Sequence, residues 1–177
     1  MDSQQSGDVD AARPYQTIYR AMTLEDILQV HQLDQRSFSL PWPERSYKYE
    51  ITQNPNAITM VAEAVFADGR RLIVGMIVSW LIVDEIHIGT VAVDAAFRRH
   101  GIGRQLVART LLAGAAQGGS LAYLEVRRSN QGAQALYVQM GFEMAGERRG
   151  YYHDNREDAL LMTLSHLNQA TLAGWVV

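Results

Sequence analysis

The sequence predicts a single α/β domain of the α+β kind, in which helices lie on the faces of a mixed sheet. Three observations lead to this prediction. Segments with strand spacing alternate along the chain with segments whose apolar residues recur at helical spacing. The glycine-containing motif Arg98–Gly103 (RRHGIG) stands where a strand gives way to a helix. The chain has 177 residues, a natural length for one domain with a full core, and we find no internal repeat or linker.

The first third of the chain carries the signals of one strand, two helices and the loop between them. We expect a strand at 17–21 and then a helix that Thr23 caps and that ends near 38. Leu24, Ile27 and Leu28 recur at helical spacing and predict the buried face of this helix. A proline-stiffened loop then leads into a short helix at 44–53.

The middle of the chain predicts three consecutive strands. Runs at 58–66 and 72–83 flank the turn Asp68-Gly69, an arrangement typical of an antiparallel hairpin. A turn at Asp84-Glu85 opens the third strand, which ends at Val93. The remaining elements are expected as a helix at 102–116, a strand at 121–126, a helix at 130–140, and strands at 142–152 and 159–163.

The junction at Arg98–Gly103 has the properties of an anion-binding turn. A helix start exposes free backbone N–H groups and the positive end of the helix dipole. Glycine lets another molecule approach that backbone closely, and Arg98, Arg99 and Arg104 add positive charge beside it. A tight structural turn with solvated arginines would have the same sequence, so the motif alone leaves both interpretations open. A functional turn of this kind is suited to a phosphate or pyrophosphate.

Two other phosphate-binding motifs do not match this junction. Leu106 stands where the third glycine of a dinucleotide-binding Gly-x-Gly-x-x-Gly would lie. No Gly-Lys-Ser/Thr follows, which excludes a Walker loop. We therefore expect a phosphate-bearing ligand of another kind.

Composition argues against several classes of function. The net charge of −3 speaks against a nucleic-acid binder held by bulk electrostatics. The chain has no cysteine, which rules out disulfides, thiolate metal sites and a cysteine nucleophile. Its five histidines include no His-x-x-x-His pair, so no metal site is predicted. The polar start of the chain is not a signal peptide, and no apolar run has the length needed to span a membrane.

Two residues in the last third of the chain are candidates for acid–base chemistry. Glu125 places a carboxylate inside an apolar strand, where an unpaired charge costs free energy. It is either an edge residue, a structural partner of Arg127 or Arg128, or a general base whose pKa burial raises. Tyr137 lies on the apolar side of a helix and is either a core aromatic or a proton donor. Asn130 can cap that helix, bind a ligand amide, or do both.

The order of these motifs resembles the GCN5-related N-acetyltransferase (GNAT) superfamily, and the resemblance spans about 18–164. It is carried by the glycine motif after a strand, the Glu-bearing strand, and the Asn-capped helix that precedes Gly141-Phe142. Several segments are similar to one branch, the ribosomal-protein-alanine N-acetyltransferases and their archaeal N-terminal acetyltransferase relatives. These segments are Phe38–Trp42 (FSLPW), Gly89–Val93 (GTVAV), Leu124–Asn130 (LEVRRSN), Ala135–Phe142, Gly150–Tyr152 and Glu157–Met162.

The resemblance implies a GNAT-like, mostly antiparallel sheet with helices on both faces, and acetyl-CoA as cosubstrate. In that superfamily the glycine turn cradles the pyrophosphate. The strand before it pairs with the pantetheine arm and polarises the thioester carbonyl through backbone N–H groups. The cofactor-binding residues expected on this basis are Val91, Ala92, Val93, Arg98, Arg99, His100, Gly101, Ile102, Gly103, Arg104 and Asn130.

The resemblance also implies direct attack by an amine in a ternary complex, without an acyl-enzyme. A free α-amino group has a pKa of about 7.7–8.0 and is mostly protonated at neutral pH, so a base must remove its proton. In this branch Glu125 matches the proposed base, acting directly or through a water, and Tyr137 matches the proposed acid that protonates the CoA sulfur. The substrate-binding residues expected on the same basis are Phe38, Leu40, Pro41, Trp42, Tyr151 and Tyr152.

We therefore predict an enzyme that acetylates the N-terminal α-amine of a protein or peptide, with the alanine of a ribosomal protein as candidate acceptor. The alternative is a GNAT enzyme that acts on a small-molecule amine or a lysine side chain. A non-catalytic acyl-CoA-binding module is disfavoured because Glu125 and Tyr137 are both present. We expect a leader at 1–14, the acetyltransferase domain at 15–165 and a tail at 166–177. The protein is expected in the cytoplasm as a monomer or weak dimer, with no metal, nucleic-acid or membrane partner.

Overall fold

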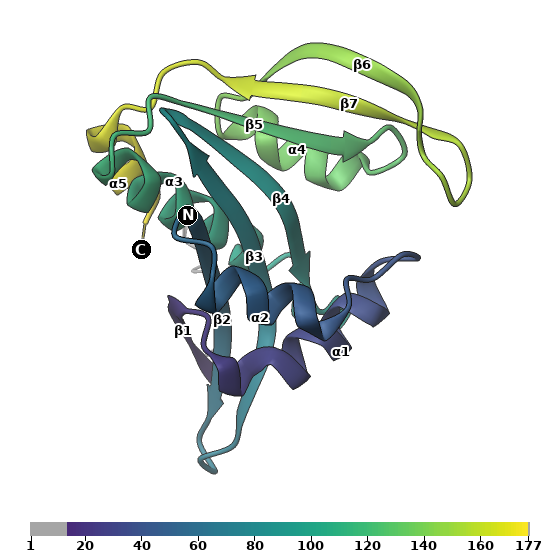
Figure 1. The fold of residues 1–177 in the computed structure, drawn as a ribbon. Helices are drawn as coiled ribbons and strands as arrows, with labels where there is room; N and C mark the ends of the chain where they lie inside the picture. The colour runs from purple at the N-terminus through teal and green to yellow at the C-terminus, as the bar shows by residue number, and fades with distance from the viewer. Residues whose placement is uncertain (1–13, 177) are drawn as a thin grey trace, which may run out of the picture.

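The computed structural model describes residues 14–176 and contains one sheet of seven strands (Figure 1). The leader predicted at 1–14 lies outside the described residues except for its last position. The strands are β1 (Tyr15–Ala21), β2 (Ala57–Phe66), β3 (Arg71–Ile82), β4 (Glu85–Val93), β5 (Leu121–Arg127), β6 (Glu143–Tyr152) and β7 (Glu157–Leu164). The helices are α1 (Ile27–Ser37), α2 (Glu44–Thr52), α3 (Ile102–Ala116), α4 (Gln131–Gln139) and α5 (Gln169–Trp175).

The strand order in the sheet is β1-β2-β3-β4-β5-β7-β6. Every neighbouring pair is antiparallel except β4 and β5, which confirms the predicted mixed and mostly antiparallel sheet. The hairpin around Asp68-Gly69 is also confirmed. The next turn lies at Val83-Asp84 and not at the predicted Asp84-Glu85, because Glu85 already pairs with Ile82 as the first residue of β4.

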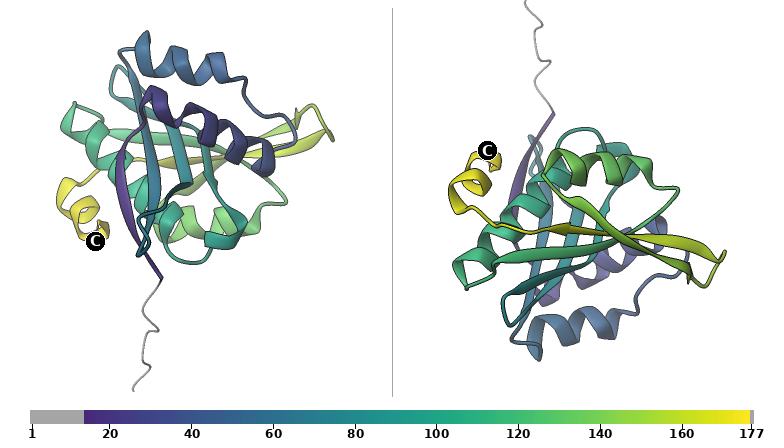
Figure 2. Two further views of the ribbon diagram at one scale, coloured as in Figure 1. Left: turned by 90° about the horizontal axis from the view of Figure 1, so that it is seen from below. Right: turned by 90° about the horizontal axis from the view of Figure 1, so that it is seen from above.

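Two hydrophobic clusters lie on opposite faces of the sheet, as Figure 2 shows for the helices that cover them. Helices α1 and α2 bury Val30, Leu33 and Tyr47 against β2 and β3. Helices α3, α4 and α5 pack on the other face, where Leu106 and Leu111 of α3 are fully buried. The prediction of helices on both faces is therefore confirmed.

The buried face of α1 differs from the predicted one. Leu24 and Leu28 are 50% and 61% exposed, whereas Val30, Leu33 and Asp34 are buried. Asp34 occupies the core side because its carboxylate accepts a backbone N–H from the loop after the helix. Of Leu24, Ile27 and Leu28, only Ile27 packs against this core, and the apolar residues Val30 and Leu33 were not included in the predicted face.

Helix α5 was not predicted, since the segment after Ser165 is weakly patterned. Asn168 caps it by accepting the backbone N–H of Thr171 at 3.1 Å. Leu172 is 1% exposed within the cluster that contains α3, and the Gln105 side chain donates to the carbonyl of Trp175 at 2.7 Å. The end of the chain therefore contributes to the core. Along 14–176 no helix has the length and apolar character required to cross a membrane.

Candidate active site

The parallel strands β4 and β5 separate part of the way along the sheet. Their pairing runs only from Glu85, opposite Leu121, to Ile88, opposite Leu124. Beyond Ile88, β4 pairs with β3 alone, and beyond Leu124, β5 pairs with β7 alone. Figure 1 shows β4 turning away from β5 at this point, which we call the fork. Residues 89–93 of β4 thus present one backbone edge that no strand of the described chain covers.

Gly89 is the first residue of β4 beyond the fork. A β-bulge lies here, because Val78 and Ser79 of β3 pair with Thr90 and Ile88 and leave Gly89 without an opposite residue. A Cβ on Gly89 would lie 2.3 Å from the Trp80 ring, so this position requires glycine. The indole N–H of Trp80 in turn donates to the Glu50 carboxylate at 2.8 Å, which fixes the ring against the strand.

Helix α3 begins beside the exposed edge of β4. Its N-cap, Gly101, has φ +77°, a left-handed conformation that glycine adopts without a steric penalty. Because glycine has no side chain to cap the helix, the first N–H groups keep their capacity to bind an anion. A Cβ on Gly103 would make ordinary contacts of 3.6 Å with Leu136 and Val93. Packing within the protein therefore does not require glycine at position 103. Close approach of a ligand to the backbone would explain why a glycine stands there.

Exposed basic side chains surround the first turn of α3. They are Arg98, Arg99, His100 and Arg104. The Nε of Arg98 donates to the Val93 carbonyl at 3.0 Å and ties the turn to the end of β4. Tyr15 Oη and His100 Nδ1 lie 3.2 Å apart. Uncapped N–H groups, arginines and an uncovered strand edge match the phosphates and amides of acetyl-CoA, so the residues present fit this cosubstrate.

Glu125 lies on β5 directly beyond the fork, and its side chain is 28% exposed. Its ion-pair partner is Arg148 of β6, with 2.7 Å between Nη1 and Oε1. The predicted partners were wrong. Arg127 pairs with Asp154 and Glu157. Arg128 pairs with Glu147 and Asp158. Because β6 lies two strands from β5 in the sheet, no local sequence pattern indicates the contact with Arg148.

Tyr137 of α4 is 7% exposed and packs against Phe142, with 5.7 Å between ring centroids. Burial, with a smaller contribution from Tyr152, raises the pKa of Tyr137 to about 12. A tyrosine hydroxyl is protonated at neutral pH even with its ordinary pKa of about 10, and the raised pKa extends this into the alkaline range. Asn130 caps α4 as expected, accepting the backbone N–H of Ala133 at 3.1 Å.

The two tyrosines at the end of β6 face the same region. Their rings are nearly perpendicular, with centroids 5.2 Å apart. Hydrogen bonding to Glu125 raises the pKa of Tyr151. Burial raises the pKa of Tyr152 to about 12, opposed by the charge of Arg127 and assisted by that of Glu125. The electrostatic interactions that shift these pKa values show that the four side chains lie near one another: Glu125, Tyr137, Tyr151 and Tyr152.

The loop Phe38–Trp42 is fixed at both ends by Asp34, a residue that the sequence did not single out. The backbone carbonyl of Asp34 accepts the N–H of Phe38 at 2.9 Å, and its carboxylate accepts the N–H of Trp42 at 2.5 Å. The Trp42 ring stacks on Trp80 with centroids 6.0 Å apart. Leu40 is 62% exposed. The loop is thus anchored through Trp42 and presents Phe38 and Leu40 outward.

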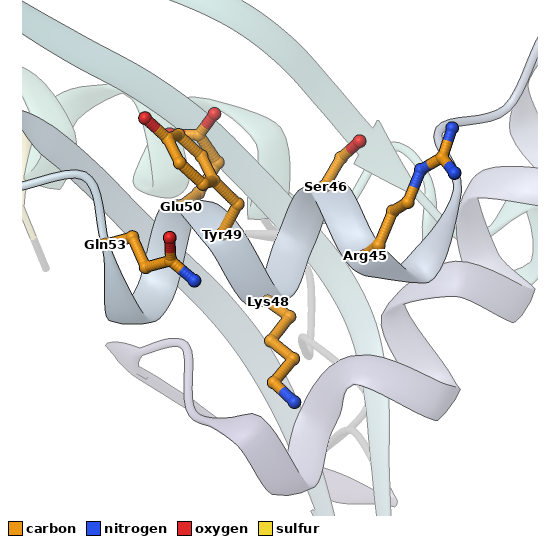
Figure 3. A pocket seen from close by; sticks show the side chains of 6 residues that line it. All are labelled: Arg45, Ser46, Lys48, Tyr49, Glu50 and Gln53. Carbon is orange, nitrogen blue, oxygen red and sulfur yellow. The ribbon is translucent and has the colours of Figure 1, made fainter.

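A shallow hollow of about 500 Å³ lies elsewhere, on the surface of α2 (Figure 3). The side chains that line it come from that helix and from Gln53 directly after it, and none belongs to the predicted site. The lining residues are Arg45, Ser46, Lys48, Tyr49, Glu50 and Gln53. The carboxylate of Glu50 is already bound by Trp80 and Asn54.

Comparison with known proteins gives concordant results. Residues 27–142 match the acetyltransferase (GNAT) family. A putative [ribosomal protein bS18]-alanine N-acetyltransferase of Bacillus subtilis is 35% identical over 143 residues, which cover 81% of this chain and 91% of that protein. The Escherichia coli [ribosomal protein bS18]-alanine N-acetyltransferase is 31% identical over 150 residues, covering 78% and 90%. The crystal structure of the Escherichia coli ribosomal-protein-S18-alanine N-acetyltransferase superposes with a TM-score of 0.74 at 28% identity, covering 86% and 96% of the two chains.

Proposed function

The chain belongs to the acetyltransferase (GNAT) family, and from this premise we propose that it acetylates the N-terminal alanine of ribosomal protein bS18. It is an N-acetyltransferase with acetyl-CoA as cosubstrate. The names of its relatives support the choice of acceptor. Ribosomal proteins are made in the cytoplasm, and we place the enzyme there for that reason.

The fork is the observation that carries this proposal. It puts the uncovered edge at 89–93, the start of α3 and the Glu125 carboxylate at one opening in the sheet. Bound acetyl-CoA supplies the activated acetyl thioester. The backbone at 89–93 would pair with its pantetheine arm, and the N–H groups of α3 with Arg98, Arg99 and Arg104 would bind its phosphates.

Proton transfer at the fork is assigned to Glu125 and Tyr137. Glu125 removes the proton of the incoming ammonium group, so that the amine lone pair can attack the acetyl carbonyl. The backbone N–H groups at 91–93 stabilise the oxyanion that develops. Tyr137, whose hydroxyl is protonated at neutral pH, gives a proton to the departing sulfur and regains the proton that the nitrogen loses as the amide forms. Arg148 and Tyr151 orient the Glu125 carboxylate.

The acceptor is proposed to enter between two walls. Phe38, Leu40 and Pro41 form one wall, anchored through Trp42, and Tyr151 with Tyr152 forms the other. A proline-stiffened loop and two aromatic rings build a narrow slot at low entropic cost. Such a slot suits an extended N-terminus with a small first side chain. A lysine substrate would need a channel open at both ends, so that the chain can continue on either side.

A peptide panel tests the proposal. Peptides with a free N-terminal alanine, with a blocked N-terminus, and with an internal lysine are incubated with the protein and acetyl-CoA, and mass spectrometry locates the label. We expect acetyl on the free α-amine of alanine and none on the blocked peptide. Label found mainly on internal lysines, with free N-termini untouched, would overturn the N-terminal assignment.

A further inference from the structure

Arg127 has no part in the proton transfers proposed above, yet it lies on the same strand as Glu125 and contacts Tyr152 of the proposed acceptor site. It ends β5 two residues after Glu125, so both side chains project from the same face of the sheet. Its guanidinium lies 3.8 Å from the centroid of the Tyr152 ring. Its side chain is 25% exposed, which leaves it partly shielded from solvent. Arg127 therefore contacts one wall of the acceptor slot directly.

The guanidinium also binds the turn that follows Tyr152. Nη2 lies 2.8 Å from Oδ2 of Asp154. Nη1 donates to Oδ1 of Asn155 and is paired with Oε2 of Glu157, both at 3.2 Å. The planar fork of an arginine can satisfy several acceptors at fixed angles, which a lysine cannot do. One cation thus holds the carboxylate of Asp154 in the β6–β7 turn and that of Glu157 at the start of β7, which would otherwise repel each other.

Ser39 connects this cluster to the other wall of the slot. Its hydroxyl donates to the Asp154 carboxylate and lies 3.5 Å from Nη2 of Arg127. Hydrogen bonding, from Ser39 first and then from Arg127, holds the pKa of Asp154 below its usual value. The hydrogen bond from Ser39 to Asp154 joins the Phe38–Trp42 loop to the β6–β7 turn, and Arg127 of β5 contacts both residues. The two walls come from opposite ends of the sequence, and Arg127, Asp154 and Ser39 join them.

We propose that Arg127 is a positioning residue that fixes the width of the acceptor slot by holding the β6–β7 turn and the Phe38–Trp42 loop together. This inference rests on the proposed function. Loss of Arg127 should affect binding of the acceptor and not of CoA, because the contacts of Arg127 are with the acceptor walls and not with the basic residues at the start of α3. Removing the guanidinium should let the walls separate and weaken acceptor binding, while the cosubstrate site stays intact.

Steady-state kinetics with a peptide that begins with alanine provide the test, at saturating acetyl-CoA. Arg127→Met keeps much of the length of the side chain but removes its charge and donors. We expect the KM for the peptide to rise about tenfold, which corresponds to about 1.4 kcal/mol, with kcat changed less than about threefold. Calorimetry with CoA alone should give an unchanged Kd. Arg127→Lys should recover part of the loss, since it restores the charge but not the fork.

Arg128→Met is the matched control, because Arg128 pairs with Glu147 and Asp158 outside this cluster; its peptide KM should not change. Ser39→Ala removes one exposed hydroxyl, so folding is not at risk, and it should raise the peptide KM in the same direction. Combined with Arg127→Met it should add little, because the connection is already broken.

An unchanged peptide KM in Ser39→Ala and Arg127→Met, or an equal loss of CoA affinity, would overturn the inference. No acetylation of any peptide by the unaltered protein would instead overturn the proposed function, and this inference with it.

Discussion

Glu125 is held by Arg148 and Tyr151 at the opening of the fork, where the proposed mechanism needs a base for the incoming amine. Glu125→Gln keeps the shape of the side chain but cannot accept the proton. We expect kcat to fall by about 10²–10⁴-fold, the usual contribution of general-base assistance, with unchanged affinity for CoA. Glu143→Gln, at an exposed position of β6, is the control and should leave kcat unchanged. A loss below about threefold in Glu125→Gln would reduce Glu125 to a structural charge.

Tyr137 is a buried aromatic and a candidate acid at the same time. Tyr137→Phe retains the ring and its packing against Phe142 but has no proton to donate. We expect the melting temperature to change little and the rate of acetyl transfer to fall, as rapid-mixing kinetics of a single turnover would measure. Tyr49→Phe, on the exposed surface of α2, is the control. An unchanged single-turnover rate in Tyr137→Phe would leave only the packing role.

The raised pKa of Tyr137 predicts the shape of the pH profile. Because this pKa is about 12, the hydroxyl stays protonated well into the alkaline range. The acceptor amine loses its proton near its pKa of about 7.7–8.0, so kcat/KM should rise through that range. We expect no falling limb below about pH 10, measured with a buffer series and an enzyme shown to be folded at each pH. A decline between about pH 8 and 9 would contradict a tyrosine acid with a raised pKa.

At the scale of elements, Gly103 at the start of α3 allows the stability of the fold and the binding of CoA to be tested separately. A Cβ on Gly103 makes only ordinary contacts, and alanine favours a helix over glycine by about 0.5–1 kcal/mol. Gly103→Ala should therefore keep or raise the stability, measured by urea unfolding, yet lower the affinity for CoA measured by calorimetry. Gly174→Ala in α5, where a Cβ meets nothing within 4 Å, should affect stability alone. Equal CoA affinity in both variants would place the phosphates elsewhere.

Some elements were predicted correctly from the sequence, and others were not. The unit at Arg98–Gly103 was predicted because its signals are local: a strand, a glycine turn and a helical pattern follow one another. The predicted buried face of α1 was wrong in part, because Ile27 packs against the core but Val30 and Leu33 are buried in place of Leu24 and Leu28. Asp34 was missed because a polar residue that is buried to hold the Phe38–Trp42 loop gives no apolar signal. Helix α5 was missed because seven residues give a weak periodic signal, and its burial depends on α3.

For the molecule as a whole, the sequence indicates which motifs could form a site but not the contacts that position their side chains. Glu125 and Tyr152 belong to motifs that resemble a family, and both lie near the fork. The partners that position them come from distant parts of the chain, such as Arg148 for Glu125 and Ser39 for the β6–β7 turn. The strand order β5-β7-β6 brings Arg148 near Glu125, whereas Ser39 comes from the loop between α1 and α2. No spacing within one segment encodes either contact.

Helix α5 lies beyond the predicted domain at 15–165, and its contribution to the stability of the fold can be measured. Leu172 of α5 is 1% exposed in the cluster that contains α3, the helix proposed to bind the phosphates. Leu172→Ala should lower the free energy of unfolding by about 2–5 kcal/mol, as for other fully buried leucines, measured by urea denaturation. Val138→Ala, 61% exposed on α4, should change it by less than about 0.5 kcal/mol. If α5 were an appendage, both variants would behave alike. Since α5 packs against the full core, we expect Leu172→Ala to lose stability while its kcat and CoA affinity stay unchanged below the unfolding transition.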